Sequence, residues 1–167
     1  DRVGADFEKA VISIEDQLSA SPVAIQIPIG AEEEFTGVID LVSMQELRFK
    51  DEGFGEEYES AELSDELRAS AQDWRRQMLE HLSLFDDDLL EKIVEEQQVE
   101  QEEIVKILRK ATLSGKITPV LCGSAFKNKG VQLLLDAVVN YLPSPFDIPP
   151  VQGDHPVTKK PVSREAS

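Results

Sequence analysis

The chain has 167 residues, of which 41% are hydrophobic and 30% charged, a composition typical of a globular domain with a buried core. Its net charge of −16 argues against a surface that grips nucleic acid and favours a basic protein partner, although charge that only keeps the chain in solution fits equally well. No apolar run approaches the roughly 20 residues that span a bilayer, and the single cysteine excludes an internal disulfide and a cysteine-based metal site.

The first third of the chain predicts one helix followed by a cluster of strands. Apolar residues recur every three or four positions over 5–18, which places them on one face of a helix. Apolar residues alternate over 23–29, which predicts a strand, and Pro28 favours the edge of a sheet because it lacks an amide donor. Further strands are expected at 35–41, 44–49 and 57–59.

The remainder predicts a group of helices, one strand and a last helix. The strongest helical periodicity covers 63–85, and helices over 88–96 and 101–114 follow it. The short apolar run 117–122 predicts a buried strand. The helix expected at 130–142 has an apolar stripe that we assign to the core, consisting of Val131, Leu134, Leu135, Val138 and Leu142.

This order of elements predicts an α/β fold in which an α+β insert interrupts the closing part of an α/β domain. Residues 1–21 and 117–145 would form the α/β part, and 22–116 the insert, with antiparallel strands and about three helices. Residues 146–167 show no periodicity and are expected to be a linker. The strand at 117–122 should lack some of its neighbours, so we expect the first and last helices to pack loosely or to associate between copies.

The loop at 123–130 carries the most informative motif. It follows a predicted strand and leads into a helix, which is where open α/β sheets bind ligands. Its small residues would let the backbone approach a flat base, and the Ala125 amide is placed to donate to a carbonyl oxygen of that base. The alternative is an ordinary turn between a strand and a helix.

Three separated stretches resemble the elongation factor G family of translational GTPases, in the family's order. They read DRVGADF at 1–7, PVAIQIPIG at 22–30, and GSAFKNKG with the following helix at 123–145. Phe126 favours the bacterial form of the family. The alternatives within the superfamily are the tetracycline-resistance and release-factor GTPases, and FKNK at 126–129 argues against both.

The resemblance implies a guanine site and a fold that is the C-terminal part of a P-loop-type GTPase domain. Asp1 would be the last residue of an Asn-Lys-X-Asp motif, whose carboxylate accepts from two guanine nitrogens, unless it is merely a frayed terminal residue. Ser124 and Ala125, in the loop that begins at Gly123, would direct a backbone amide at the base oxygen.

No Gly-x-x-x-x-Gly-Lys-Ser/Thr phosphate loop occurs in the 167 residues. We therefore expect this chain to be part of a larger GTPase that binds GTP or GDP, with Mg²⁺ held by parts outside these residues. We expect no catalytic residue, metal ligand or tightly bound nucleotide here, and no GTP hydrolysis by this chain alone.

The insert resembles the subdomain that, in the family, contacts the ribosomal stalk protein, whose C-terminal domain offers a basic helical face. Acids on the polar side of the helix 63–85 are the candidate contacts: Asp65, Glu66, Asp73 and Glu80. The alternative is a solvated helix face. The resemblance implies a cytoplasmic, ribosome-binding protein that contacts no membrane and whose acidic insert binds no nucleic acid directly. A free-standing acidic protein-binding module is the competing hypothesis.

Overall fold

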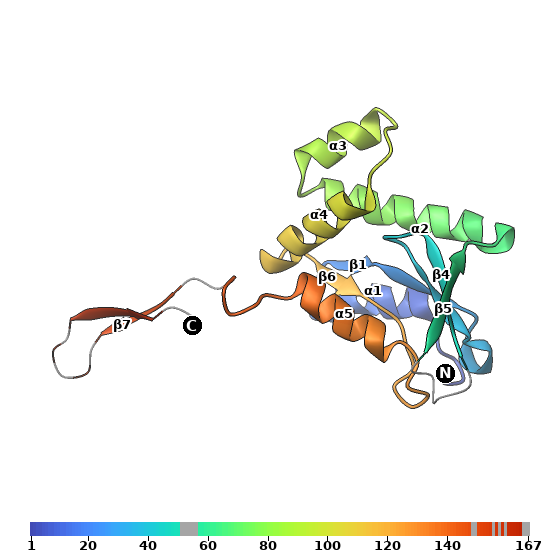
Figure 1. The fold of residues 1–167 in the computed structure, drawn as a ribbon, viewed down its shortest axis with the longest axis horizontal. Coiled ribbons are helices and arrows are strands. Elements are labelled where there is room, and N and C mark those ends of the chain that lie inside the picture. Colours follow the sequence, from blue (N-terminus) through green and yellow to red (C-terminus); the bar gives the residue numbers. More distant parts are fainter. Residues whose placement is uncertain (51–56, 148–149, 155, 157, 159, 165–167) are drawn as a thin grey trace.

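The structure, a computed structural model, describes residues 1–50, 57–147, 150–154, 156, 158 and 160–164. The described residues form a mixed α/β fold (Figure 1). In chain order the elements are α1 (Phe7–Leu18), β1 (Pro22–Ala24), β2 (Gln26–Ile29), the 3-10 turn η1 (Glu32–Glu34), β3 (Gly37–Asp40), β4 (Gln45–Phe49), β5 (Tyr58–Glu62), α2 (Asp65–Ser83), α3 (Asp87–Val94), α4 (Gln101–Leu113), β6 (Thr118–Val120), α5 (Val131–Tyr141), β7 (Val151–Asp154) and β8 (Pro161–Arg164).

The strands form one parallel pair, one antiparallel sheet and one hairpin. β1 pairs with β6 in parallel, and β2-β3-β4-β5 form an antiparallel sheet in which β2 is an edge, as Pro28 predicts. The predicted strand at 23–29 is therefore two strands. The chain changes sheets at Ile25, which donates to Val120 O and accepts from Leu41 N, both at 3.0 Å.

The antiparallel sheet packs on both faces, because successive strand residues point to opposite sides. One face contributes Ile27, Ile29 and Ile39 to the main core, together with apolar residues of α2, α3 and α4. The opposite face contributes Val38, Leu47 and Phe49 to a smaller cluster. Leu133 of α5 belongs to this smaller cluster, so α5 covers the second face of the sheet.

The predicted helices are confirmed to within two residues at each end. Of the two helices expected to pack loosely, the first has no buried residue, whereas the last buries Leu133 and Tyr141. The main anchor of α1 is Phe7, whose ring lies 5.7 Å from that of Trp74. β6 is less buried than the sequence predicts: Thr118 is exposed and Val120 half-buried. The reason is that β6 pairs only with β1 among the described strands.

The core side of the last helix was predicted wrongly. Leu133 and Tyr141 are its buried residues, whereas Leu134, Leu135, Val138 and Leu142 are between 42% and 59% exposed. Val131 is half-buried. The buried stripe lies at 133, 137 and 141, positions four residues apart that share one face of the helix. Leu133 packs in the smaller cluster, whereas Ala137 and Tyr141 pack against the main core.

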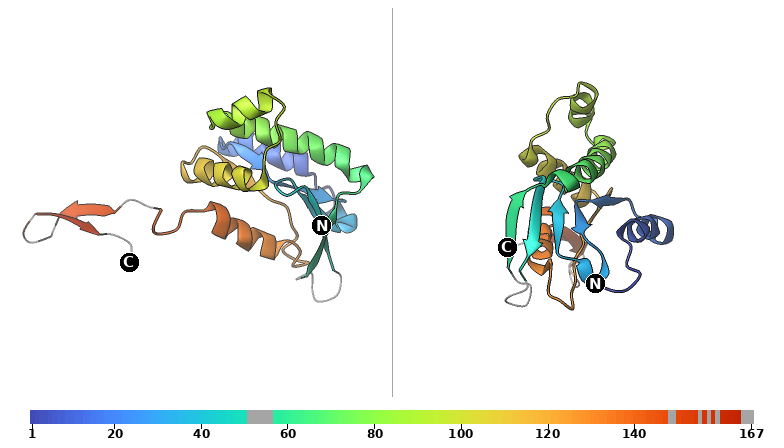
Figure 2. Two further views of the ribbon diagram at one scale, coloured as in Figure 1. Left: turned by 45° about the horizontal axis from the view of Figure 1, so that its top comes forward. Right: turned by 90° about the vertical axis from the view of Figure 1, so that its right-hand side faces the viewer.

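The C-terminal segment differs from the expected linker. β7 and β8 pair in an antiparallel hairpin, with Val151 opposite Arg164. This hairpin extends away from the rest of the chain, as two views agree (Figures 1 and 2). None of the described helices combines the length and apolar character needed to cross a membrane.

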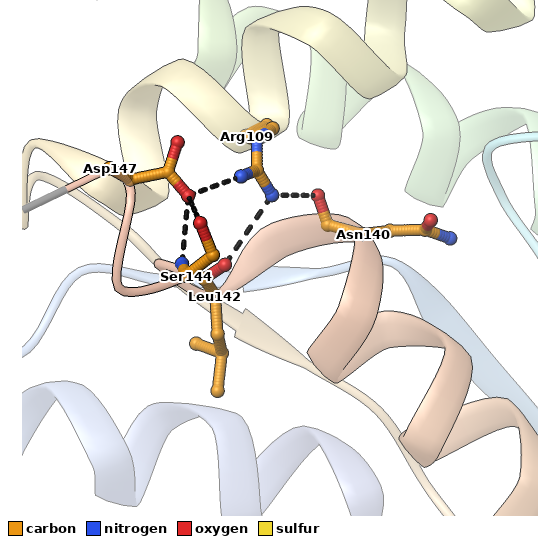
Figure 3. A network of polar contacts seen from close by, with 5 residues as sticks. All are labelled: Arg109, Asn140, Leu142, Ser144 and Asp147. Atoms are coloured by element: carbon orange, nitrogen blue, oxygen red, sulfur yellow. Dashed lines mark hydrogen bonds and ion pairs between the residues drawn. The ribbon is translucent and has the colours of Figure 1, made fainter. Parts of the chain in front are cut away.

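A cluster of polar contacts, here called the exit clasp, fixes the chain where it leaves α5 (Figure 3). Arg109 of α4 donates to Asn140 O at 2.8 Å, to Leu142 O at 3.4 Å and to Asp147 Oδ2 at 2.7 Å. The Ser144 amide and hydroxyl both donate to that same oxygen at 2.7 Å. Bonds from Ser144, with the Arg109 charge, lower the pKa of Asp147.

Candidate functional site

The loop between β6 and α5 is closed on itself by backbone hydrogen bonds. Ser124 and Lys129 form an isolated antiparallel bridge, in which each amide donates to the other residue's carbonyl at 2.9 Å. The Asn128 amide also donates to Ala125 O at 3.3 Å. These bonds hold residues 124–129 in a tight hairpin-like turn.

Three residues explain why the sequence turns here. Asn128 has φ 56° and Gly130 has φ 86°, both left-handed conformations that asparagine and glycine tolerate best. A Cβ on Gly123 would lie 2.7 Å from Lys129 O, too close for any side chain. A Cβ on Gly130 would lie 3.1 Å from Cys122 O. The loop can therefore close only with small residues at its two ends.

The loop is joined to the start of the chain by one side-chain contact. Ser124, only 2% exposed, donates its hydroxyl to Asp1 Oδ2 at 2.7 Å across 123 positions of sequence. The same Ser124 oxygen accepts from the Lys127 amide at 3.1 Å. The turn that follows Asp1 is itself tethered, because the Gly4 amide donates to Glu32 Oε1 at 2.6 Å. Asp1 is therefore held beside the loop.

Ala125 lies at the exposed tip of this loop. None of the hydrogen bonds found among the described residues uses its amide, which leaves the amide available to an incoming acceptor. Ala125, Gly123 and Ser124 line a cavity of about 240 Å³ that extends to Leu134 of α5. Cys122 lines it as well, but burial raises the pKa of its thiol to about 12, so the thiolate is scarce at neutral pH.

The four acids predicted on the helix 63–85 are all exposed on α2. Asp73 and Glu80 flank Arg76 at 3.4 and 3.3 Å, and Asp65 lies 3.7 Å from Arg68. Arg76 thus offsets part of the negative charge that the sequence assigns to this face. These acids lie on a different element from the loop and form a separate surface.

Two supporting residues of the loop were not foreseen from the sequence. Glu32 follows a glycine in an acidic run that reads only as a turn, and its contact with Gly4 depends on tertiary structure. The sequence gives Asn128 only as part of the motif, although asparagine tolerates the left-handed backbone that this turn requires. Among the residues that the structure describes, no group of three or more His, Cys, Asp or Glu is placed to hold a metal ion.

Comparison with known proteins identifies the family to which this chain belongs. Residues 1–144 match the family model of the elongation factor Tu GTP binding domain. The chain is 50% identical over 158 residues to elongation factor G of Aquifex pyrophilus, a match that covers 95% of this chain but only 23% of that relative. A crystal structure from Thermus thermophilus superposes with a TM-score of 0.71 at 28% identity, over 88% of this chain and 22% of that one. The chain thus belongs to the family of the elongation factor Tu GTP-binding domain.

Proposed function

We propose that this chain is part of a ribosomal translocation GTPase of the elongation factor G type, and that its loop 123–125 and Asp1 recognise guanine. The observation that carries the proposal is the Ser124–Asp1 contact at 2.7 Å, beside the unused amide of Ala125. A carboxylate there would accept from the ring and exocyclic nitrogens of guanine, while the Ala125 amide donates to its carbonyl oxygen. Adenine presents the opposite pattern, so the pair would discriminate between the two bases.

Under this proposal the phosphates and Mg²⁺ belong to other parts of the parent protein, which acts in the cytoplasm. The 167 residues contain no phosphate-loop motif. The residues described here would hold only the base, through Asp1, Gly123, Ser124 and Ala125. GTP hydrolysis supplies the energy of the parent's cycle, and this chain's contribution is to select and orient the nucleotide.

A nucleotide titration followed by NMR tests the base-recognition proposal. GDP should shift the backbone amides of Gly123, Ser124 and Ala125, whereas ADP should leave them unchanged. Affinity should be weak, with a Kd in the range of roughly 0.1 to 1 mM, because only the base is held. Ser124→Ala should reduce the GDP shifts, and Ser114→Ala, on the exposed end of α4, should not. Equal shifts with GDP and ADP would contradict guanine recognition.

We further propose that the α2 acids dock the basic face of the ribosomal stalk protein's C-terminal domain. The supporting observation is that Asp65, Glu66, Asp73 and Glu80 are all exposed on one helix. Charge-steered contacts of this kind weaken as salt is added.

Titrating the stalk domain onto the chain at 20 and 300 mM salt tests the docking proposal. Binding should weaken with salt and with the double variant Asp73→Asn/Glu80→Gln. The matched double variant Glu15→Gln/Asp16→Asn, on exposed positions of α1, should bind as the unchanged chain does. Absence of binding even at 20 mM salt would overturn the docking proposal and leave guanine recognition untouched.

A further inference from the structure

A second cavity, distinct from the loop, lies between α5 and the antiparallel sheet. Its volume is about 320 Å³. Every strand of that sheet and α5 contribute polar residues to its lining, among them Gln26, Asp40, Gln45, Ser60, Asp136 and Tyr141, and Gln101 of α4 lines it as well. None of these residues belongs to the guanine or stalk-protein proposals.

The strand register explains why polar groups gather here. Gln26 lies opposite Asp40, and Asp40 lies opposite Gln45, so the three side chains form one row across the sheet. The next row on the same face contains Val38 and Leu47, and it packs with Leu133 of α5. The apolar row is thus covered by α5, whereas the polar row faces the cavity.

The polar row includes an acceptor that the protein itself does not satisfy. Gln26 is only 6% exposed, and its Oε1 has no hydrogen-bond partner among the described residues. Leaving a buried amide oxygen unpaired costs free energy, which a donor from a bound group would recover once the side chain reorients towards it.

The lining of the cavity carries net negative charge, part of which Arg75, outside the lining, offsets through its attraction to Asp40. Asp40 and Asp136 line it, and the lining residues of the described chain include no Lys or Arg. Asp40 accepts from Val42 N and Ser43 Oγ, each at 2.8 Å, and retains further lone pairs. The nearby guanidinium of Arg75 is engaged with Leu41 O and Val42 O. Burial and the Asp40 charge raise the pKa of Tyr141 to about 12, consistent with an electronegative, poorly solvated wall.

We propose that this cavity binds a guanidinium group. Such a cation is planar, carries five N–H donors and stacks on aromatic rings, so it suits a site with acceptors on several sides. Tyr58 and Tyr141 are the aromatic residues among its lining. The volume lies at the lower end of the range of about 300 to 1,000 Å³ for ligand sites, enough for a guanidinium and its alkyl stem. The group comes either from a free solute or from an arginine side chain of a protein.

An NMR titration of the ¹⁵N-labelled chain with methylguanidinium chloride tests the proposal, with ionic strength held constant by NaCl. Saturable shifts should be confined to amides around the cavity, such as Gln26, Asp40 and Asp136. Tetramethylammonium has the same charge but no N–H donor, so it should give no saturable shift there. Equal effects of the two cations, or unsaturable shifts spread over the acidic surface, would overturn the proposal.

Asp136→Asn provides the sharpest variant, because Asp136 is exposed on α5 and its loss should leave the fold intact. It should weaken methylguanidinium binding about tenfold, the effect of losing one charge-assisted hydrogen bond. Glu102→Gln, an exposed acid on α4, is the matched control and should bind as the unchanged chain does. Undiminished binding by a folded Asp136→Asn chain would refute the assignment.

The source of the group is decided by comparing methylguanidinium with a blocked Gly-Arg-Gly peptide. Binding of the peptide at least about tenfold more tightly would assign the site to an arginine of a partner protein, since backbone contacts add affinity. Equal or weaker binding of the peptide would assign it to a free solute.

Discussion

At the scale of single residues, the loop at 123–130 depends on a serine hydroxyl and a glycine that other residue types cannot replace without losing a hydrogen bond or crowding the backbone. The hydroxyl of Ser124 both donates to Asp1 and accepts from the Lys127 amide, so one oxygen holds two segments. Gly130 combines a left-handed backbone with a close carbonyl neighbour. The sequence motif identifies these residues, but it does not reveal that the loop is closed by its own hydrogen bonds.

Ser124→Ala should destabilise the chain by about 1 to 2 kcal/mol, because it removes one hydrogen bond and leaves the Lys127 amide without its acceptor. Urea denaturation followed by circular dichroism measures this loss. Ser70→Ala, at an exposed position of α2, should change stability by less than about 0.5 kcal/mol. Equal losses in the two variants would show that the hydroxyl contributes nothing specific.

Gly130→Ala should cost more than Gly115→Ala. Both glycines have positive φ, 86° and 68°, so each substitution carries a backbone strain of about 1 kcal/mol. At Gly130 the new Cβ would also lie 3.1 Å from Cys122 O, whereas nothing lies within 4 Å at Gly115. The difference in thermal midpoint between the two variants measures the effect of the close contact with Cys122 O. A smaller decrease in midpoint for Gly130→Ala than for Gly115→Ala would contradict this prediction.

At the scale of elements, the helices followed from the sequence because their apolar periodicity is long. The last helix shows the limit of that approach: three consecutive leucines give it two possible apolar faces, and only the position of the sheet selects Leu133. The β7–β8 hairpin was missed because Val151–Asp154 and Pro161–Arg164 are short and do not alternate. The polar row at Gln26 depends on strand register, which the sequence leaves open.

Asp86→Ala should loosen α3, which this residue caps. Asp86 Oδ1 accepts from the Leu89 amide at 3.3 Å, and Oδ2 lies 2.9 Å from Lys110 Nζ on α4. Loss of the cap should cost about 1 kcal/mol, whereas Asp86→Asn, which can still cap, should cost less. Hydrogen exchange of the α3 amides measures the effect. Equal exchange in both variants would assign the effect to the ion pair rather than to the cap.

The same residue gives a pH dependence. The bond from Lys110, followed by that from the Leu89 amide, lowers the pKa of Asp86 in the folded chain. Its stabilisation is therefore present above the ordinary carboxyl pKa of about 3.9 and is lost as the pH falls through the lower, folded value. The urea midpoint should decrease less between pH 6 and pH 3 for Asp86→Asn than for the unchanged chain. An identical decrease in the two chains would show that Asp86 does not contribute to the loss of stability at low pH.

At the scale of the whole molecule, 33 acids against 17 bases create a repulsion that local ion pairs relieve only in part. Raising NaCl from 10 to 500 mM should increase the thermal midpoint by a few degrees, because the Debye length falls from about 30 Å to a few ångströms. Scanning calorimetry measures the shift, and sucrose at matched osmolality is the control. A midpoint that falls with salt would mean that the ion pairs outweigh the repulsion.

The exit clasp has a mechanical consequence. α4 is seated in the main core by Ile104, Ile107 and Leu108, while residues 142–147 lead outward to the β7–β8 hairpin. The planar guanidinium of Arg109 donates both to carbonyl oxygens at the end of α5 and to Asp147 in the turn that follows. A shift of α4 relative to α5 would break these bonds, so one guanidinium couples the position of α4 to the direction in which residues 142–147 leave α5.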